Sequence, residues 1–254
     1  MSSSKQLLVF VVFCHRTREL TFNTALESVN AIRKSSPEFD VGYIFIDDGS
    51  CDTITTRWIE KSISLLRQEP NVMISEMLVH EHRLGLSSSL QSTIEYLDEI
   101  GLENLVWITQ IPGNDQLSED SLASFLSYPL KHELRILWRE NPKARPILKR
   151  TASSVLQLLV RFFLFPDIRQ VTANYIAPLN HYKRWLNPKS GHAYGLWLIA
   201  GAQIDNVPVS QSGFSLKIRS RNGHEAVRKV PNLDQIFHVL FQLVKVKIFL
   251  KKNL

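Results

Sequence analysis

The segment Val41-Gly-Tyr-Ile-Phe-Ile-Asp-Asp-Gly-Ser-Cys-Asp52 decides our prediction of the fold. Its residues Tyr43–Ile46 are aromatic or β-branched, which is typical of a buried strand. Two carboxylates, Asp47 and Asp48, follow at the end of this strand, and Gly49-Ser50 then predicts a sharp turn. After the turn, Ser50 or Asp52 can cap a helix that we expect to begin near Thr53.

The adjacent carboxylates Asp47 and Asp48 indicate a ligand site. In an open α/β sheet, ligands bind in the crevice beyond the carboxyl ends of the strands. Two neighbouring carboxylates repel each other there unless a cation, a donor-rich ligand or water compensates their charge. The doublet fits a purely structural role equally well, with Asp47 capping the turn and Asp48 solvated.

Strands and helices alternate over residues 1–130. Apolar runs predict strands at residues 6–13, 43–46, 72–79 and 105–109. The spacing of apolar residues and the capping residues predict helices that begin near residues 19, 53, 87 and 118. This alternation predicts a mostly parallel, doubly wound α/β sheet with helices on both faces.

The pattern of residues 131–254 is less regular. It predicts strands at residues 134–138 and 171–178, and an edge strand at residues 206–209 because this segment contains Pro208. It also predicts helices at residues 153–165, 181–186, 194–202 and 231–250, with basic loops at residues 139–150 and 217–229. We expect residues 1–130 and 131–254 to form the two halves of one continuous domain.

The overall composition is that of a globular protein with a basic balance. Of the 254 residues, 44% are hydrophobic and 21% are charged, which excludes a mainly disordered chain. The chain has 30 Lys and Arg against 24 Asp and Glu, a formal net charge of +6. This modest excess is compatible with a polyanionic ligand, a nucleotide diphosphate or an anionic membrane surface.

Cys14 and Cys51 are the two cysteines, and neither has the spacing of a disulfide framework or a zinc site. We therefore expect a reducing compartment, the cytoplasm. We expect Cys14 to be a small buried side chain rather than a nucleophile, because no base can be paired with it. The apolar run at residues 6–14 is too short to span a bilayer, so we interpret it as a core strand.

The order of these segments resembles that of the family-2 glycosyltransferases, which have the GT-A nucleotide-sugar fold. Within that family it looks most like the branch of polyprenyl-phosphate (dolichol-phosphate-type) sugar transferases. The resemblance rests on six segments in order, of which only the second is sharp by itself: the strand, loop and helix of Leu7–Val29; Asp47-Asp-Gly-Ser-Cys-Asp52; the loop His82–Ser87 with its Gly; Pro112-Gly-Asn-Asp-Gln116; the basic segment from Arg145 to Ser154; and Val207-Pro-Val209 followed by Arg219–Arg228.

The resemblance implies an inverting glycosyltransferase. It would move a sugar from a nucleotide-diphospho-sugar to a lipid-phosphate or glycan-precursor acceptor, assisted by Mg²⁺ or Mn²⁺, as in cell envelope polysaccharide biosynthesis. Residues 1–130 would bind the donor, and residues 131–254 would form an acceptor-side half with an amphipathic C-terminal helix. Asn114 and Asp115 would be the catalytic residues and metal ligands. The implied substrate-binding residues are His15, Asp47, Asp48, Arg83, Gly85, Arg145, Arg150, Arg219 and Arg221.

Two departures from the family pattern bear on activity. The second acidic motif has Asn114 where the branch has Asp, and the stretch Tyr194–Ala200 lacks the acid that many members use as a general base. A sugar hydroxyl must lose a proton to attack, whereas a phosphate acceptor is already anionic. The missing acid therefore favours a lipid-phosphate acceptor. Both departures also fit the alternative of a catalytically weakened member that acts as a binding or scaffold protein.

Three further features have two interpretations each. We expect His80, Glu81 and His82 to line the nucleotide pocket rather than bind metal, because their spacing is unspecific. We expect the apolar residues of helices 153–165 and 231–250 to be core, although basic flanks also allow peripheral contact with the inner membrane face. A basic nucleic-acid-binding α/β protein is a weaker alternative; no recognised motif supports it, so we expect no nucleic-acid partner.

Overall fold

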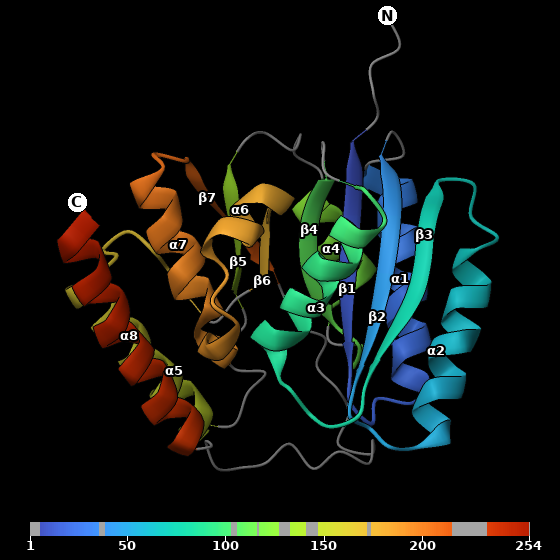
Figure 1. Ribbon diagram of the computed structural model, residues 1–254, viewed down its shortest axis with the longest axis horizontal. Coiled ribbons are helices and arrows are strands. Elements are labelled where there is room, and N and C mark those ends of the chain that lie inside the picture. The colour runs from blue at the N-terminus through green and yellow to red at the C-terminus, as the bar shows by residue number, and fades with distance from the viewer. Residues whose placement is uncertain are drawn as a thin grey trace, which may run out of the picture.

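In the part of the chain that the structure describes, the strands form one seven-stranded sheet in the order β3-β2-β1-β4-β6-β5-β7 (Figure 1). The computed structural model describes residues 6–35, 39–102, 106–115, 117–126, 133–140, 147–171, 174–214 and 233–253. The strands are β1 (Leu7–Cys14), β2 (Asp40–Asp48), β3 (Val72–His80), β4 (Val106–Pro112), β5 (Leu134–Arg139), β6 (Asn174–Pro178) and β7 (Val209–Phe214).

The helices alternate with these strands along the chain. They are α1 (Glu19–Ser35), α2 (Thr53–Leu66), α3 (Leu86–Glu99), α4 (Glu119–Leu126), α5 (Ile147–Phe163), α6 (Leu179–Trp185), the 3-10 helix η2 (Pro188–Ala193), α7 (Tyr194–Ile204) and α8 (Leu233–Asn253). None of the helices in the described ranges combines the length and the apolar character needed to cross a membrane.

An inner strand of the sheet, β1, is apolar on both faces. It pairs in parallel with β2 on one side and β4 on the other. Successive side chains of a strand point to opposite faces. Leu8 and Phe10 accordingly belong to one hydrophobic core, and Val9 and Val11 belong to a second core on the other face. A strand buried in this way reads as a continuous apolar run in the sequence.

Helices cover both faces of the sheet, as the sequence predicts. Residues of α1, α2 and α4 form one core with one face of the sheet, and residues of α3, α6 and α7 form the other core with the opposite face. α8 and α5 contact each other and lie outermost on the second side, at the left of Figure 1. The prediction of a GT-A-type, mostly parallel sheet with a less regular second half is confirmed.

The second half of the sheet contains one strand that runs against its neighbours. β6 is antiparallel to β4 and to β5, whereas β7 is parallel to β5 and forms the edge of the sheet. The edge strand begins at Val209, later than the predicted start at residue 206. Pro208 lies just before it and accepts a hydrogen bond from the Leu134 N–H at 2.9 Å, a role that needs no N–H of its own.

One boundary changes the position of a predicted site residue. α5 begins at Ile147, six residues earlier than the predicted start at Ser153. Arg150 therefore lies on a helix, and the prediction that it belongs to a basic loop is wrong. The 3-10 helix η2 was also absent from the sequence prediction; its Asn187 side chain accepts a hydrogen bond from the Lys189 N–H at 3.0 Å.

Candidate functional site

The two turns with acidic residues lie at the same edge of the sheet, on either side of β1. In the strand register, Cys14 is opposite Asp47 and Phe13 is opposite Pro112. The Gly113 N–H also donates a hydrogen bond to the Phe13 carbonyl at 2.8 Å. Because neighbouring strands are about 4.8 Å apart, the ends of β2 and β4 are separated by roughly 10 Å, with only β1 between them.

Two glycines allow the turns to pack closely against neighbouring backbone. A side chain at Gly49, whose φ is +67°, would begin 2.5 Å from the Arg83 nitrogen. A side chain at Gly113 would begin 2.6 Å from the Phe13 carbonyl oxygen. The first glycine therefore joins the β2 turn to the β3–α3 loop, and the second joins the β4 turn to the end of β1.

Backbone strain is concentrated at this edge of the sheet. Arg16, Arg18, Cys51 and Asp115 have positive φ angles between 52° and 56°, and they lie in the loops that follow β1, β2 and β4. Non-glycine residues rarely adopt this conformation, which costs about 1 kcal/mol or more for each. Such residues cluster at ligand sites, where the surrounding structure holds them in place.

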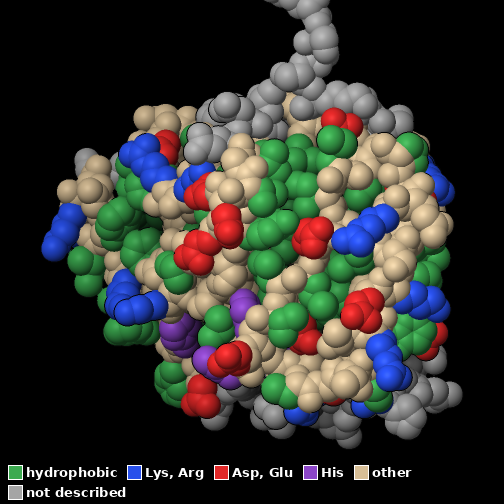
Figure 2. Space-filling view, turned by 45° about the vertical axis from the view of Figure 1, so that its right-hand side comes forward, with side chains coloured by type: hydrophobic (Ala, Val, Ile, Leu, Met, Phe, Trp, Pro, Cys, Tyr) green, Lys and Arg blue, Asp and Glu red, His purple; other side chains and the backbone are tan. Residues whose placement is uncertain are grey.

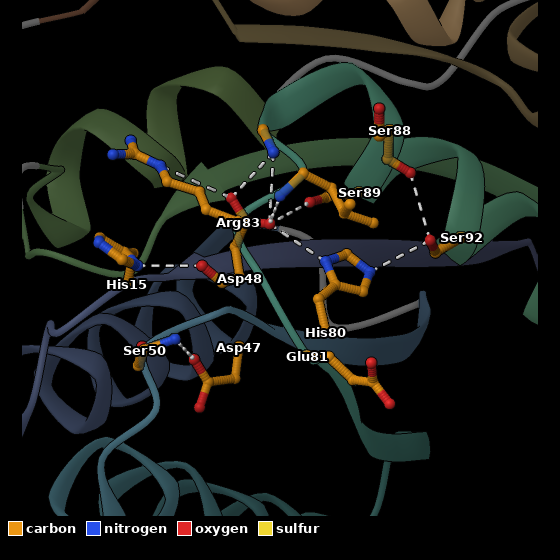
Figure 3. A network of polar contacts seen from close by, with 12 residues as sticks. His15, Asp47, Asp48, Ser50, His80, Glu81, Arg83, Ser88, Ser89 and Ser92 are labelled. Carbon is orange, nitrogen blue, oxygen red and sulfur yellow. Dashed lines mark hydrogen bonds and ion pairs between the residues drawn. The ribbon is translucent and has the colours of Figure 1, made fainter.

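Asp47 holds its own turn together. Its Oδ1 accepts a hydrogen bond from the Ser50 N–H at 3.0 Å (Figure 3), and Asp47 is buried. Ser50 Oγ in turn accepts a hydrogen bond from the Arg16 N–H at 2.9 Å, and His15 Nδ1 lies 3.0 Å from the Asp48 carbonyl oxygen. The loops after β1 and β2 are therefore joined by two polar contacts.

Asp48 joins β2 to the segment that leads into α3. Its Oδ1 accepts a hydrogen bond from the Leu84 N–H at 2.8 Å, and its Oδ2 accepts one from the Gly85 N–H at 3.1 Å. Burial by itself would raise the pKa of this carboxyl, but the hydrogen bonds from Leu84, His80 and Gly85 outweigh it, so the pKa is lowered. Asp48 is buried, so the alternative of a solvated side chain is wrong.

His80 extends this network to the body of α3. Its Nδ1 lies 3.1 Å from Asp48 Oδ1, and its Nε2 lies 3.2 Å from Ser92 Oγ. Ser92 Oγ donates to the Ser88 carbonyl within the helix at 3.3 Å (Figure 3). The sequence predicts that His80 lines a pocket and gives no sign of this bridging position, because Ser92 lies in a helix with no distinguishing motif.

The second turn contains an oxygen atom with the character of a cation ligand. Asn114 Oδ1 is buried and has no hydrogen-bond partner. The turn itself is held by α1: Thr24 Oγ1 accepts a hydrogen bond from the Asp115 N–H at 3.0 Å, and Thr21 Oγ1 donates to the Gly113 carbonyl at 3.3 Å. Mg²⁺ and Mn²⁺ prefer oxygen ligands, including amide oxygens and carboxylates, so Asn114 and Asp115 fit such an ion.

Protein ligands alone do not complete a metal site here. Within the described ranges, no group of three or more His, Cys, Asp or Glu side chains could hold a metal ion. Mg²⁺ sites in nucleotide enzymes often use only one or two carboxylates together with substrate phosphates and water. The donor set therefore fits a cation that binds together with a diphosphate.

Positive charge lies on the α3 side of the same edge. The Arg83 side chain is mostly exposed, and its Nε is 3.9 Å from Asp48 Oδ2. The pKa of His192 is lowered by loss of solvent around its ring and by the nearby charges of Arg83 and His238. Figure 2 shows histidine side chains gathered on this part of the surface, toward the lower left.

The structure brings only some of the predicted residues together. His15, Asp47, Asp48, Arg83 and Gly85 surround the end of β2, and Asn114 and Asp115 form the turn after β4. Arg150 lies on α5, on the outer layer of the second half. Three predicted arginines lie outside the described residues: Arg145, Arg219 and Arg221.

Two other predictions concern side chains that do not react. Cys14 is fully buried, and this burial raises the pKa of its thiol to about 12, so it is not an activated nucleophile. Most of α7 is buried and apolar, and it has no acidic residue between Tyr194 and Ile204.

The sequence did not indicate Thr21 and Thr24 as site residues, because their hydrogen bonds to the turn after β4 depend on how α1 packs against that turn.

Comparison with solved structures supports the fold assignment. Mannosyl-3-phosphoglycerate synthase from Rubrobacter xylanophilus is similar, with a TM-score of 0.61 and 10% identity over 98% of this chain and 76% of that one. Glucosyl-3-phosphoglycerate synthase from Mycobacterium tuberculosis, in complex with Mn²⁺, UDP and glucosyl-3-phosphoglycerate, has a TM-score of 0.52 and 14% identity over 96% and 80%. S. aureus TarS 1-349 has a TM-score of 0.53 and 12% identity over 96% and 65%.

Sequence comparison adds nothing to these structural similarities. No family model matches the chain, and no curated protein matches it. At such low identities the similarity of the structures establishes the fold and not the activity. The chain has the GT-A fold, in which the compared structures are glycosyltransferases.

Proposed function

We propose that this GT-A-fold protein is a glycosyltransferase that moves a sugar from a nucleotide-diphospho-sugar to a phosphate-bearing acceptor, by preference a lipid phosphate. The observation that carries the proposal is the pairing of two turns at the carboxyl edge of one sheet. The turn after β2 and the turn after β4 flank β1, and the second contains the unpartnered buried oxygen of Asn114. Crevices at this edge are where open α/β sheets bind ligands.

The residues at this edge have chemically distinct roles in the proposed reaction. Transfer breaks the bond between the sugar and the diphosphate, and negative charge grows on the diphosphate as it leaves. Asn114 and Asp115 would hold the divalent cation that neutralises this charge. Arg83 supplies positive charge on the opposite side of the β2 turn. Asp48 is a positioning residue, because it fixes the backbone of Leu84 and Gly85 beside that turn.

The absence of an acidic residue on α7 supports the choice of a phosphate acceptor. A hydroxyl acceptor needs a group that removes its proton, and no residue of α7 can do so. A phosphate oxygen is already a nucleophile and needs none. The glucosyl-3-phosphoglycerate synthase structures include complexes with phosphoglyceric acid, so phosphate-bearing acceptors occur among proteins of similar fold. A polyprenyl phosphate also carries a phosphate group, in which a phosphate oxygen would be the nucleophile, and inversion at the sugar is the expected outcome of a single direct attack.

Thermal unfolding with a panel of nucleotide-diphospho-sugars tests the donor. A ligand that binds only the folded protein raises the free energy of unfolding by about 2.7 kcal/mol when its concentration is a hundred times its Kd. We expect one donor class to raise the melting temperature, with a larger rise when Mn²⁺ is present. Asp115→Asn should remove the Mn²⁺-dependent part, whereas Glu60→Gln on the exposed side of α2 should not. Failure of every donor to stabilise the protein would contradict the proposal.

Two observations favour a second function, that of a binding or scaffold protein with a weakened site. Asp48 is occupied by hydrogen bonds from its own chain, and Asn114 stands where a second carboxylate would strengthen cation binding. A binding or scaffold protein with a weakened site would bind nucleotides with an affinity indifferent to Mn²⁺ and would not turn over sugar donors. Asn114→Asp separates the two functions: a gain of metal-dependent binding where the natural protein has none favours the scaffold role.

A further inference from the structure

The outer side of α5 and α8 exposes apolar side chains from both helices, and we call this surface the α5–α8 face. We propose that this face binds the surface of an anionic lipid bilayer. The exposed apolar residues that define it are Ile147, Leu148, Val155, Leu158, Phe162 and Phe163 of α5, and Phe237, Phe241, Val244 and Ile248 of α8. Phe162 is 81% exposed and Phe237 is 67% exposed, which is unusual for side chains of this size.

α8 has two apolar stripes on opposite sides. At about 100° per residue, Val239, Leu243, Val246 and Leu250 fall on one side of the helix, and Phe237, Phe241, Val244 and Ile248 fall within an arc of roughly 60° on the other. The first set is buried in the core, and the second set is exposed. We predicted that the apolar residues of this helix are core, but only one of its two apolar stripes is buried.

The exposed stripes of the two helices form one surface. α5 and α8 pack against each other, and Lys247 Nζ of α8 lies 4.5 Å from the centre of the Phe163 ring of α5. Lys245 Nζ lies 4.5 Å from the centre of the Phe241 ring. Hydrophobic and basic side chains lie next to each other at the left edge of the space-filling view (Figure 2).

The charge of the two helices identifies the occupant. Their sequences contain seven Lys and Arg and a single acidic residue, Asp234. On the helical projection, Lys245 and Lys252 flank the exposed stripe of α8 on one side, and Lys247 and Lys251 flank it on the other. An apolar stripe with phenylalanines between rows of lysine is the pattern of helices that lie in a membrane interface and attract anionic lipids.

A second copy of this chain would fit the same face poorly. A two-fold contact would bring each patch against itself, so the lysines of both copies would approach one another. Like charges in such a contact repel, whereas phosphate headgroups neutralise them. Either a second copy or a bilayer would cover the apolar stripe, but only an anionic bilayer would neutralise the lysines that flank it.

The α5–α8 face is connected to the edge that carries the candidate site. His238 of α8 places its Nε2 3.1 Å from the Ser190 carbonyl oxygen in η2. The Gly191 N–H of η2 donates to Ser87 Oγ at the start of α3, at 2.7 Å, directly after the loop held by Asp48. These contacts link α8, through η2 and the start of α3, to the loop beside the candidate site. The proposal itself needs no catalytic activity.

Vesicle flotation tests the proposal with the intact protein. We expect it to float with vesicles of phosphatidylcholine mixed with phosphatidylglycerol and to bind phosphatidylcholine vesicles much more weakly. The double variant Phe162→Ser/Phe241→Ser should lower the partition onto anionic vesicles by roughly tenfold to a hundredfold. Lys245→Gln/Lys252→Gln should lower it by roughly tenfold. Met73→Ser, on β3 at the other side of the molecule, removes an exposed apolar side chain (66% exposed) and should have no effect.

The variants alter exposed residues, so each should keep the melting temperature and near-ultraviolet dichroism of the natural protein. Absence of flotation, or flotation that the phenylalanine variant retains, would overturn the proposal. So would a dimer, seen by analytical ultracentrifugation, that dissociates in the phenylalanine variant while the natural protein ignores vesicles. Flotation without sugar-transfer activity would instead contradict the function proposed above and would support the proposal that the α5–α8 face binds membranes.

Discussion

Asp48 connects two segments that are far apart in the sequence, the end of β2 and residues 80–85. Its carboxylate lies at the end of β2, accepts hydrogen bonds from the Leu84 and Gly85 backbone, and contacts His80 at the end of β3. Charge-assisted hydrogen bonds to a buried carboxylate are among the stronger contacts in a protein. The shape of the loop beside the candidate site therefore depends on this one ionised side chain.

We predict that Asp48→Asn lowers the free energy of unfolding by about 1–3 kcal/mol near neutral pH, because an amide nitrogen would face backbone donors. The folded state lowers the pKa of Asp48, so its stabilisation is present above the unfolded pKa of roughly 4 and is lost as the pH falls through the folded value. The difference between the two proteins should therefore shrink in acid. Urea unfolding over a pH series measures it.

Glu99→Gln is the matched control for Asp48→Asn, because it removes a carboxylate at the exposed end of α3. Its free energy of unfolding should stay within about 0.5 kcal/mol of the natural protein. A difference for Asp48→Asn that persists unchanged into acid would show that the carboxylate charge is not what stabilises the loop.

The sequence revealed the Asp-Asp-Gly-Ser motif but not the partners of Asp48. The motif is a local string, and its strand and turn follow from residue types. Leu84 lies 36 residues further along the chain, and its meeting with Asp48 depends on how β2 and β3 are aligned. That alignment shifts between Val41 and Gly42, which no sequence pattern indicated.

α2 begins at a cap that the sequence predicted as one of two. Asp52 Oδ1 accepts a hydrogen bond from the Thr55 N–H at 2.6 Å, and Thr55 Oγ1 lies 3.2 Å from Asp52 Oδ2. Ser50, the other candidate, instead accepts a bond from Arg16. The capped helix begins directly after the strained turn and fixes the direction in which the chain leaves the candidate site.

We predict that Asp52→Ala lowers the free energy of unfolding by about 1 kcal/mol, the usual cost of losing an N-cap. Glu60→Ala removes an acidic side chain from the exposed face of the same helix and should cost less than about 0.5 kcal/mol. Chemical unfolding followed by far-ultraviolet dichroism compares the two. Equal losses would mean that net charge, and not the cap, explains the effect.

The boundaries of helices were predicted with uneven success for a physical reason. α2 has a cap, an amphipathic face and a turn after it, so its limits follow from local chemistry. The first turn of α5 contains Lys149 and Arg150, which are typical of a basic loop, and the strongest apolar run of the helix starts later. Pro146 immediately before it was a usable signal, because proline favours the start of a helix.

Because the sheet contains strands from both halves of the chain, we expect the two halves to unfold together. β4 of the first half pairs with β6 of the second, and Ile176 of β6 is fully buried beside Thr109 of β4. Separate unfolding of one half would expose this junction. The direction of β6 was not predictable, because a short apolar run carries no information about whether its neighbours are parallel.

We predict that Ile176→Ala lowers the free energy of unfolding by about 2–5 kcal/mol, and that Ile176→Val costs about 1 kcal/mol. In all three proteins, tryptophan fluorescence and far-ultraviolet dichroism should report the same urea midpoint, as expected for one cooperative unit. Two separate midpoints, with only the later one moved by Ile176→Ala, would contradict the single-domain expectation.

The position of β6 between β4 and β5 also affects the order in which the sheet can be completed as the ribosome makes the chain. The first strands pair as they emerge, because β2 joins β1 and β3 joins β2. β5 pairs only with β6 and β7 among the described strands, and both are synthesised after it. β5 therefore leaves the ribosome with its backbone unpaired and stays so until β6 has docked on β4. During that interval the nascent chain presents an open edge to other molecules, so chaperones would act most usefully at this stage of synthesis.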